Sequence, residues 1–139
     1  MKVLECSSKG DKRFSAFYAR VFAFGEFDSI ENHYQLSKRF GDFIPTSWQD
    51  AKGKNPTHIE LNGKKYDLKM MPQWYKLLWV KYLDNSPHLV EHASQYDEFN
   101  DIFKGKSINC QADVIRQYIK EGRESILNDC EELMQKFSE

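Results

Sequence analysis

The stretch Ser29-Ile-Glu-Asn-His-Tyr-Gln-Leu-Ser-Lys-Arg-Phe40 decides the fold that the sequence predicts. Asp28 and Ser29, at its start, are both residue types that cap the N-terminus of a helix. Gly41 follows it, and glycine is common just after the C-terminus of a helix. We therefore expect a helix that begins near Ile30 and ends at Gly41, preceded by two aromatic-rich, strand-like segments.

Three polar side chains of this helix fall on one stripe. Glu31, Gln35 and Lys38 are separated by four and then three residues, so a carboxylate, an amide and an amine project together. Surface helices often carry Glu and Lys, so a solvated helix face is the alternative interpretation. A second polar and aromatic cluster at residues 96–101 favours a site, because the two segments together would form a small nucleotide-handling pocket.

The composition indicates one soluble domain over residues 1–139. Hydrophobic residues make up 40% of the 139 residues and aromatic residues 14%, which is enough apolar material for one core. The formal net charge is -1, which argues against a basic protein that coats DNA and against an acidic mimic of DNA. A local basic patch stays open, because Lys and Arg cluster in several short segments.

The cysteines and the N-terminus indicate a cytoplasmic protein. Cys6, Cys110 and Cys130 are far apart and form no Cys-x-x-Cys pair, which argues against a disulfide framework and a structural zinc site. The N-terminal residues do not resemble a signal peptide. No stretch approaches the ~20 apolar residues of a membrane span, so we expect no membrane association.

The remaining pattern predicts an α+β fold that is mostly helical, with a few short strands. Asn62-Gly63 lies between two short alternating runs and predicts a β-hairpin. Residues 2–6 alternate as a strand does, and 94–106 have no clear period and are predicted as a loop. Helical periodicity is found at 72–83, 87–93 and 109–137, with Gly122 as a break in the last of these.

Five short blocks of the sequence resemble the NADAR family of N-glycosidases, in the family's order and over most of the chain. At two positions the sequence departs from the family's pattern: Asn100 stands where the family usually has Trp, and Ala112 where it has Gly. The segment 46–71 has no counterpart that we can align. The blocks are Asp11-Lys-Arg-Phe-Ser-Ala-Phe17, Ser29 to Lys38, Trp74 with Val80 to Leu89, Leu89-Val-Glu-His-Ala-Ser-Gln-Tyr-Asp97, and Gly105 to Ala112.

The resemblance implies a compact NADAR-like domain that cleaves N-glycosidic bonds of ribose. Family substrates include ribosylamino-pyrimidine intermediates of riboflavin biosynthesis and ADP-ribose attached to guanine. In such a reaction Glu31 would be the general acid/base or the carboxylate that stabilises the oxocarbenium ion. Lys38 would bind a phosphate or form a Schiff base with the opened sugar. Asp97 would be a second carboxylate or bind the ribose hydroxyls.

The expected substrate-binding residues come from the same blocks. Gln35 would orient the ribose hydroxyls, and Arg13 would contact a phosphate. Aromatic rings offer surfaces for base stacking, although Phe14 and Phe17 are more often core residues. The full expected set is Arg13, Phe14, Ser15, Phe17, Gln35, Phe99, Asn100 and Asn109.

Three hypotheses about function stay open. The first is an N-glycosidase, without metal or cofactor, that acts on an ADP-ribosylated or phosphoribosylated nucleobase, free or in a nucleic acid. Its small size suits a viral protein that reverses ADP-ribosylation by a host defence system in the host cytoplasm. The second is a nucleotide-binding or inhibitory protein that has lost catalysis. The third is a protein-interaction module without a ligand. The sequence does not determine the oligomeric state.

Overall fold

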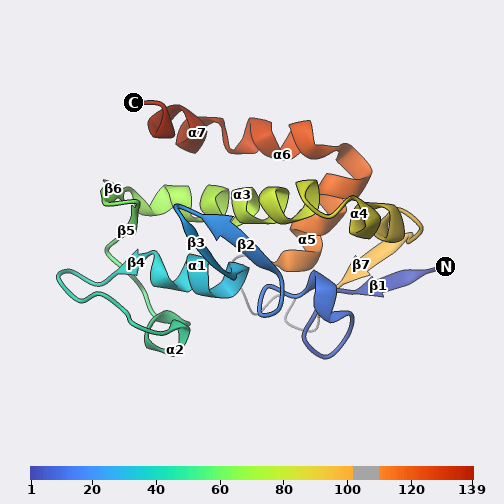
Figure 1. Ribbon diagram of the computed structural model, residues 1–139, viewed down its shortest axis with the longest axis horizontal. Helices are drawn as coiled ribbons and strands as arrows, with labels where there is room; N and C mark the ends of the chain where they lie inside the picture. Colours follow the sequence, from blue (N-terminus) through green and yellow to red (C-terminus); the bar gives the residue numbers. More distant parts are fainter. Residues whose placement is uncertain (102–109) are drawn as a thin grey trace.

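The computed structural model describes residues 1–101 and 110–139, and it has the expected α+β fold in which helix dominates (Figure 1). Its helices and strands, in chain order, are β1 (Val3–Glu5), η1 (Lys12–Phe14), β2 (Arg20–Ala23), β3 (Glu26–Ser29), α1 (Ile30–Leu36), β4 (Lys38–Arg39), α2 (Trp48–Ala51), β5 (His58–Leu61), β6 (Lys64–Tyr66), η2 (Leu68–Met70), α3 (Met71–Asp84), α4 (Pro87–Ala93), β7 (Glu98–Asn100), α5 (Gln111–Arg116), η3 (Gln117–Glu121), α6 (Arg123–Asp129) and α7 (Glu131–Phe137).

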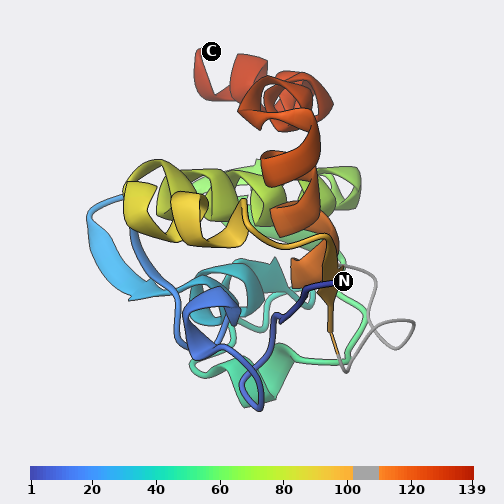
Figure 2. The ribbon, with the colours of Figure 1, turned by 90° about the vertical axis from the view of Figure 1, so that its right-hand side faces the viewer.

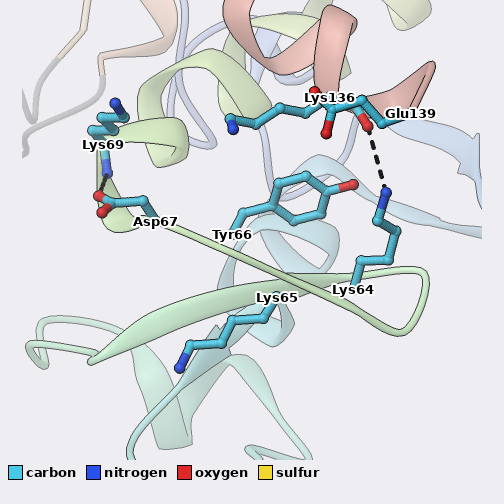
Figure 3. Close-up of a pocket in the computed structure, with 7 residues that line it drawn as sticks. All are labelled: Lys64, Lys65, Tyr66, Asp67, Lys69, Lys136 and Glu139. Carbon is cyan, nitrogen blue, oxygen red and sulfur yellow. Dashed lines mark hydrogen bonds between the residues drawn. The ribbon is translucent and has the colours of Figure 1, made fainter.

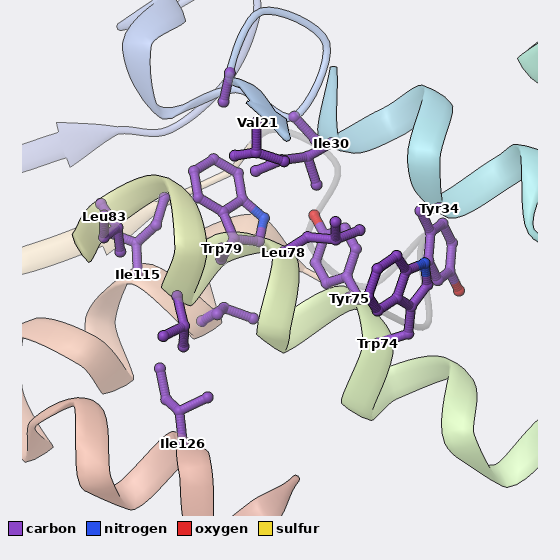
Figure 4. Close-up of a cluster of buried hydrophobic side chains, with 14 of the residues drawn as sticks. Val21, Ile30, Tyr34, Trp74, Tyr75, Leu78, Trp79, Leu83, Ile115 and Ile126 are labelled. Carbon is purple, nitrogen blue, oxygen red and sulfur yellow. The ribbon is translucent and has the colours of Figure 1, made fainter. Parts of the chain in front are cut away.

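The longest of these helices, α3, lies in the middle of the molecule. Helices α6 and α7 lie on one side of it, and α1 with the short strands lies on the other (Figures 1 and 2). Its side chains Trp74, Leu78 and Trp79 are almost fully buried, and Figure 4 shows Ile30 and Ile126 approaching the same helix from the two layers. Burial on two sides explains why α3 is apolar around most of its circumference.

The strands form three small sheets at the edges of this core. Strand β1 pairs with β7 in parallel, β2 pairs with β3 as a hairpin, and β4, β5 and β6 form an antiparallel sheet. The predicted Asn62-Gly63 turn is confirmed: it joins β5 to β6, and both residues have positive φ angles of 52° and 81°. The strand predicted near residues 2–6 and the helices predicted from Pro72 and Pro87 are also confirmed.

The prediction of a helix to Gly41 is wrong. Helix α1 ends at Leu36, and Lys38 belongs to β4, where it pairs with Ile59. The Ser37 hydroxyl donates to the Tyr34 carbonyl at 2.6 Å, and the Ser37 carbonyl accepts from the Glu60 amide at 2.8 Å. The chain therefore leaves the helix after Leu36 and forms the edge strand of a sheet whose other strands are distant in the sequence.

Two other predicted boundaries need correction. The segment 94–106, predicted as a loop, contains strand β7. In this strand Phe99 is buried, and it pairs with Leu4 of β1. The long helix predicted at 109–137 is divided into several pieces. The break at Gly122 is confirmed, and a second break occurs at Cys130, whose amide donates to the carbonyls of the last α6 turn. No helix in the described parts of the chain is both long and apolar enough to span a bilayer.

Replacing Gly122 with alanine should lower the free energy of unfolding by about 1–3 kcal/mol. Gly122 has φ 98° and ψ 156°, a conformation that only glycine adopts readily, while no neighbouring atom lies within 4 Å of the position that an alanine Cβ would occupy. The effect therefore comes from the backbone alone. Urea unfolding measures it, with the exposed neighbour substitution Glu121→Ala as control. Equal stability of the two variants would contradict this explanation.

Candidate functional site

The N-terminal turn of α1 is fixed by hydrogen bonds to the preceding loop. The Ser29 hydroxyl caps the helix by accepting from the Asn32 amide at 3.0 Å, as its position in the sequence predicts. The amides of Ile30 and Glu31 donate to the carbonyls of Ala19 and Ala16, at 2.8 and 2.9 Å. Glu31 therefore has a fixed backbone in the first helical turn, where the helix dipole favours a carboxylate.

Glu31 is buried, and two nitrogen donors hold its carboxylate. Its Oε1 accepts from Gln35 Nε2 at 3.0 Å and from Lys52 Nζ at 3.0 Å. Its side chain is 8% exposed, whereas that of Lys52 is 47% exposed. Oε2 makes no hydrogen bond to any described residue, so it is the carboxylate oxygen available for other contacts.

Lys38 is a buried amine beside this carboxylate. Its Nζ lies 3.4 Å from the Ala51 carbonyl and 5.5 Å from the centre of the Tyr34 ring. Burial lowers the pKa of Lys38 below the ordinary lysine value, and the nearby charge of Lys52 lowers it further, while Glu31 acts in the opposite direction. The neutral amine is therefore more accessible at Lys38 than at an exposed lysine.

Gln35 carries an unpaired acceptor at the same place. The residue is 4% exposed, and its Oε1 has no hydrogen-bond partner among the described residues. Its Nε2 is fixed by Glu31, which sets the orientation of the amide. A buried carbonyl oxygen without a donor is unfavourable by about 1–3 kcal/mol, so this atom is suited to accept a hydrogen bond from a ligand hydroxyl.

Aromatic rings lie next to the polar group. Lys52 Nζ lies 5.5 Å from the centre of the Phe17 ring, and Phe17 meets Trp48 edge-on at 5.2 Å. Trp48 begins α2, and Lys52 directly follows its last residue. Phe17 thus lies at the expected site, where α2 supplies Trp48 and the residue after α2 supplies Lys52.

Tyr75 of α3 lies next to this group, because its ring meets that of Tyr34 edge-on at 5.2 Å. Burial raises the pKa of the Tyr75 phenol, and the charges of Glu31, Cys110 and Asp101 add to the increase. Asp101 is itself buried and lies 3.9 Å from Cys110 Sγ. Of the carboxylates at 96–101, Asp101 is therefore the buried one.

Asp97 and Asn100 have other contacts. Asp97 Oδ2 accepts from the Lys2 amide at 2.8 Å, and Asn100 Nδ2 donates to Glu5 Oε2 at 3.2 Å. Both residues are exposed on the β1–β7 pair, which lies away from α1 in Figure 1. Phe99 is buried in the core between them, and Asn109 lies outside the described residues.

The residues expected near the first block form a structural frame. Phe14 is fully buried and stacks on His92 with ring centres 6.2 Å apart, and the fully buried Ser15 accepts from the Phe17 amide at 3.3 Å. Arg13 pairs with Asp11 at 2.7 Å and lies 3.2 Å from His92 Nε2. These contacts place Arg13 beside α4.

The structure thus brings together Glu31, Gln35, Lys38 and Phe17 of the expected set. It adds Lys52, Trp48 and Tyr75, which the sequence did not assign to a site. Lys52 had no local signal, because it belongs to the segment that we could not align and reaches Glu31 only through the fold. Among the described residues, no group of three His, Cys, Asp or Glu side chains is placed to hold a metal ion.

This arrangement defines a small α+β protein with a buried acid, a buried amine and an amide in one polar group. A family model described as DarT1-associated NADAR antitoxin matches residues 1–139. A comparison with curated proteins found no match. The chain belongs to the family of DarT1-associated NADAR antitoxins, which confirms the resemblance found in its sequence blocks.

Replacing Lys38 with methionine should keep or increase stability at neutral pH, with a rise of up to a few degrees in the unfolding temperature. Lys38 has a lowered pKa in the folded protein. At pH values below that pKa the amine is charged in both the folded and the unfolded protein, and burying the charge lowers the free energy of unfolding. Methionine removes this cost, and the gain should shrink as the pH rises toward the ordinary lysine pKa. Thermal unfolding across pH tests this, with the exposed Lys81→Met as control. A clear loss of stability relative to that control would be contrary to it.

Proposed function

We propose that this protein is an N-glycosidase that releases ADP-ribose from guanine, and that this activity is its role as an antitoxin. The observation that carries the proposal is the buried Glu31 carboxylate, held between the Gln35 amide and Lys52, with the buried amine of Lys38 beside it. The family's description as an antitoxin supports it. A phosphoribosylated nucleobase is the related substrate class, and a viral origin stays a prediction.

Glu31 is the proposed acid and charge-stabilising group. Cleavage of the bond between ribose C1 and the base nitrogen requires a proton on that nitrogen, and the positive charge that develops at C1 is stabilised only if a negative group is near. Because Gln35 and Lys52 both bind Oε1, Oε2 is the oxygen that we assign to the reacting atoms.

Lys38 is the proposed nucleophile. When the N-ribosyl amine opens to an imine, the neutral amine of Lys38 adds to C1, the bond between C1 and the base nitrogen breaks, and the base leaves with the proton. Water then adds to C1 of the lysine imine, releasing the sugar aldehyde and restoring the amine. Burial of Lys38 supports this role, because it favours the neutral amine.

The neighbouring side chains fit the remaining parts of the substrate. Gln35 Oε1 would accept from a ribose hydroxyl. Phe17 and Trp48 offer ring surfaces for the base. Lys52 is half-exposed and would exchange Glu31 for a substrate phosphate. We assign structural roles, rather than contact with the reacting atoms, to Arg13, Phe14, Ser15, Phe99, Asn100 and Asp97.

Glu31→Gln and Lys38→Met should each reduce the release of ADP-ribose from a guanine-linked substrate by at least about 100-fold, the usual range for a general acid or nucleophile. Chromatography of the released sugar measures it, with the exposed Glu91→Gln as control. Borohydride added during turnover should also fix a sugar adduct on Lys38. Two folded variants with full turnover would show that the site is assigned wrongly. A thermal shift with ADP-ribose but no release by the wild-type protein would support the inactive binding protein instead.

Lys52→Met should shift the rising limb of the pH–rate profile to higher pH. The rate requires neutral Lys38, so it rises as the pH increases through the lowered pKa of that amine. Lys52 contributes to the lowering, and its removal therefore raises the pKa of Lys38. Salt should reduce the difference from wild type, because it screens charges. The matched control is the exposed Lys54→Met in the same loop. A shift to lower pH, or none at low salt, would refute the assignment.

A further inference from the structure

A concave site lies beside the β5–β6 hairpin, and none of its lining residues belongs to the sequence blocks discussed above. It is a cavity of about 310 Å³ between β6, the η2 turn and the end of α7 (Figure 3). Its lining holds the lysines Lys64, Lys65, Lys69 and Lys136, the carboxylates Asp67 and Glu139, and Tyr66. Glu31, Gln35 and Lys38 do not line it, so it is separate from the proposed catalytic group.

The ammonium groups in this cavity are only partly neutralised. Lys69 pairs with Glu132 at 3.0 Å. Lys64 Nζ reaches only the backbone carbonyl of Lys136, at 3.5 Å, and neither Lys64 nor Lys136 has a carboxylate partner among the described residues. Asp67 also lines the cavity, but its Oδ1 accepts from the Lys69 amide at 2.9 Å. Lysines outnumber carboxylates in the lining by four to two, which favours an anion in the cavity.

The cavity has a rigid aromatic wall. Tyr66 is buried, its ring meets Phe137 of α7 edge-on at 5.8 Å, and Lys64 Nζ lies 5.9 Å from its centre. A second hollow of about 430 Å³ adjoins the first, and it shares Tyr66 and is also lined by His58 and Lys65. Two adjacent hollows with cationic side chains suit a ligand with more than one phosphate.

We propose that the β5–β6 cavity binds the phosphate groups of a nucleotide or of a nucleic-acid strand. Lys64 and Lys136 donate to the phosphate oxygens, Lys64 by leaving the backbone carbonyl that it reaches in the free protein. Tyr66 forms the wall against which the ligand lies. This binding does not depend on the proposed glycosidase activity.

Amide NMR spectra of the full chain, titrated separately with pyrophosphate, with ADP and with a short oligothymidylate at low salt, test the proposal. Resonances of Tyr66, Asp67 and Lys136 should move with at least one of these ligands. The double substitution Lys64→Gln/Lys136→Gln should weaken that binding by roughly three- to tenfold. The exposed pair Lys9→Gln/Lys81→Gln removes the same charge elsewhere and should leave it unchanged.

The ligands distinguish the two sources of phosphate. Comparable shifts with pyrophosphate and ADP indicate a free nucleotide, whereas shifts with the oligothymidylate alone, weakening steeply with salt, indicate a strand. The proposal is overturned if no ligand moves these resonances, or if the Lys64→Gln/Lys136→Gln protein, folded by its thermal transition, binds as tightly as the Lys9→Gln/Lys81→Gln control.

Discussion

Helix α1 lies against α3 through Ile30, which is fully buried, and through Tyr34, whose ring meets Tyr75 edge-on at 5.2 Å. This packing sets the depth at which Glu31 and Gln35 are held, because both belong to the same two turns of α1. It also leads the chain out of α1 into β4, which buries Lys38 beside them. The site and the core therefore share one constraint, the apolar contact between two helices of different layers (Figure 4).

A buried acid next to a buried amine would ordinarily weaken a small protein. Removing two ions from water is unfavourable, and their attraction offsets this only when hydrogen bonds are complete. Here they are incomplete: Gln35 Oε1 has no donor among the described residues, and Glu31 is shared with a half-exposed lysine. A group that lowers stability without completing its own hydrogen bonds is typical of a site shaped for a ligand.

The sequence predicts much of this fold because several of its signals are local. Asn62-Gly63 predicts a turn and Pro72 predicts the start of a helix, both through their backbone preferences. Ser29 predicts a helix cap through its hydroxyl. The end of α1 was not predictable in this way, since Ser37 and Lys38 leave the helix to pair with residues of β5. Lys52 was missed for the same reason. Conversely, Asp97 and Asp101 are both aspartates of one polar, aromatic segment, and burial distinguishes the exposed Asp97 from the interior Asp101.

Lys38 lies in strand β4 and not in the predicted helix, and this placement makes its surroundings differ from those of Lys52. Lys52 is half-exposed and reaches the Glu31 carboxylate from the solvent side of the group, where a phosphate could also bind it. Lys38 instead has a backbone that is fixed by sheet pairing, and the residue as a whole is only 6% exposed. Desolvation lowers the pKa of Lys38 there, Glu31 partly opposes this, and the charge of Lys52 lowers it further. Burial thus favours the neutral amine at Lys38, and only the neutral amine has the lone pair that covalent chemistry at a sugar carbon requires.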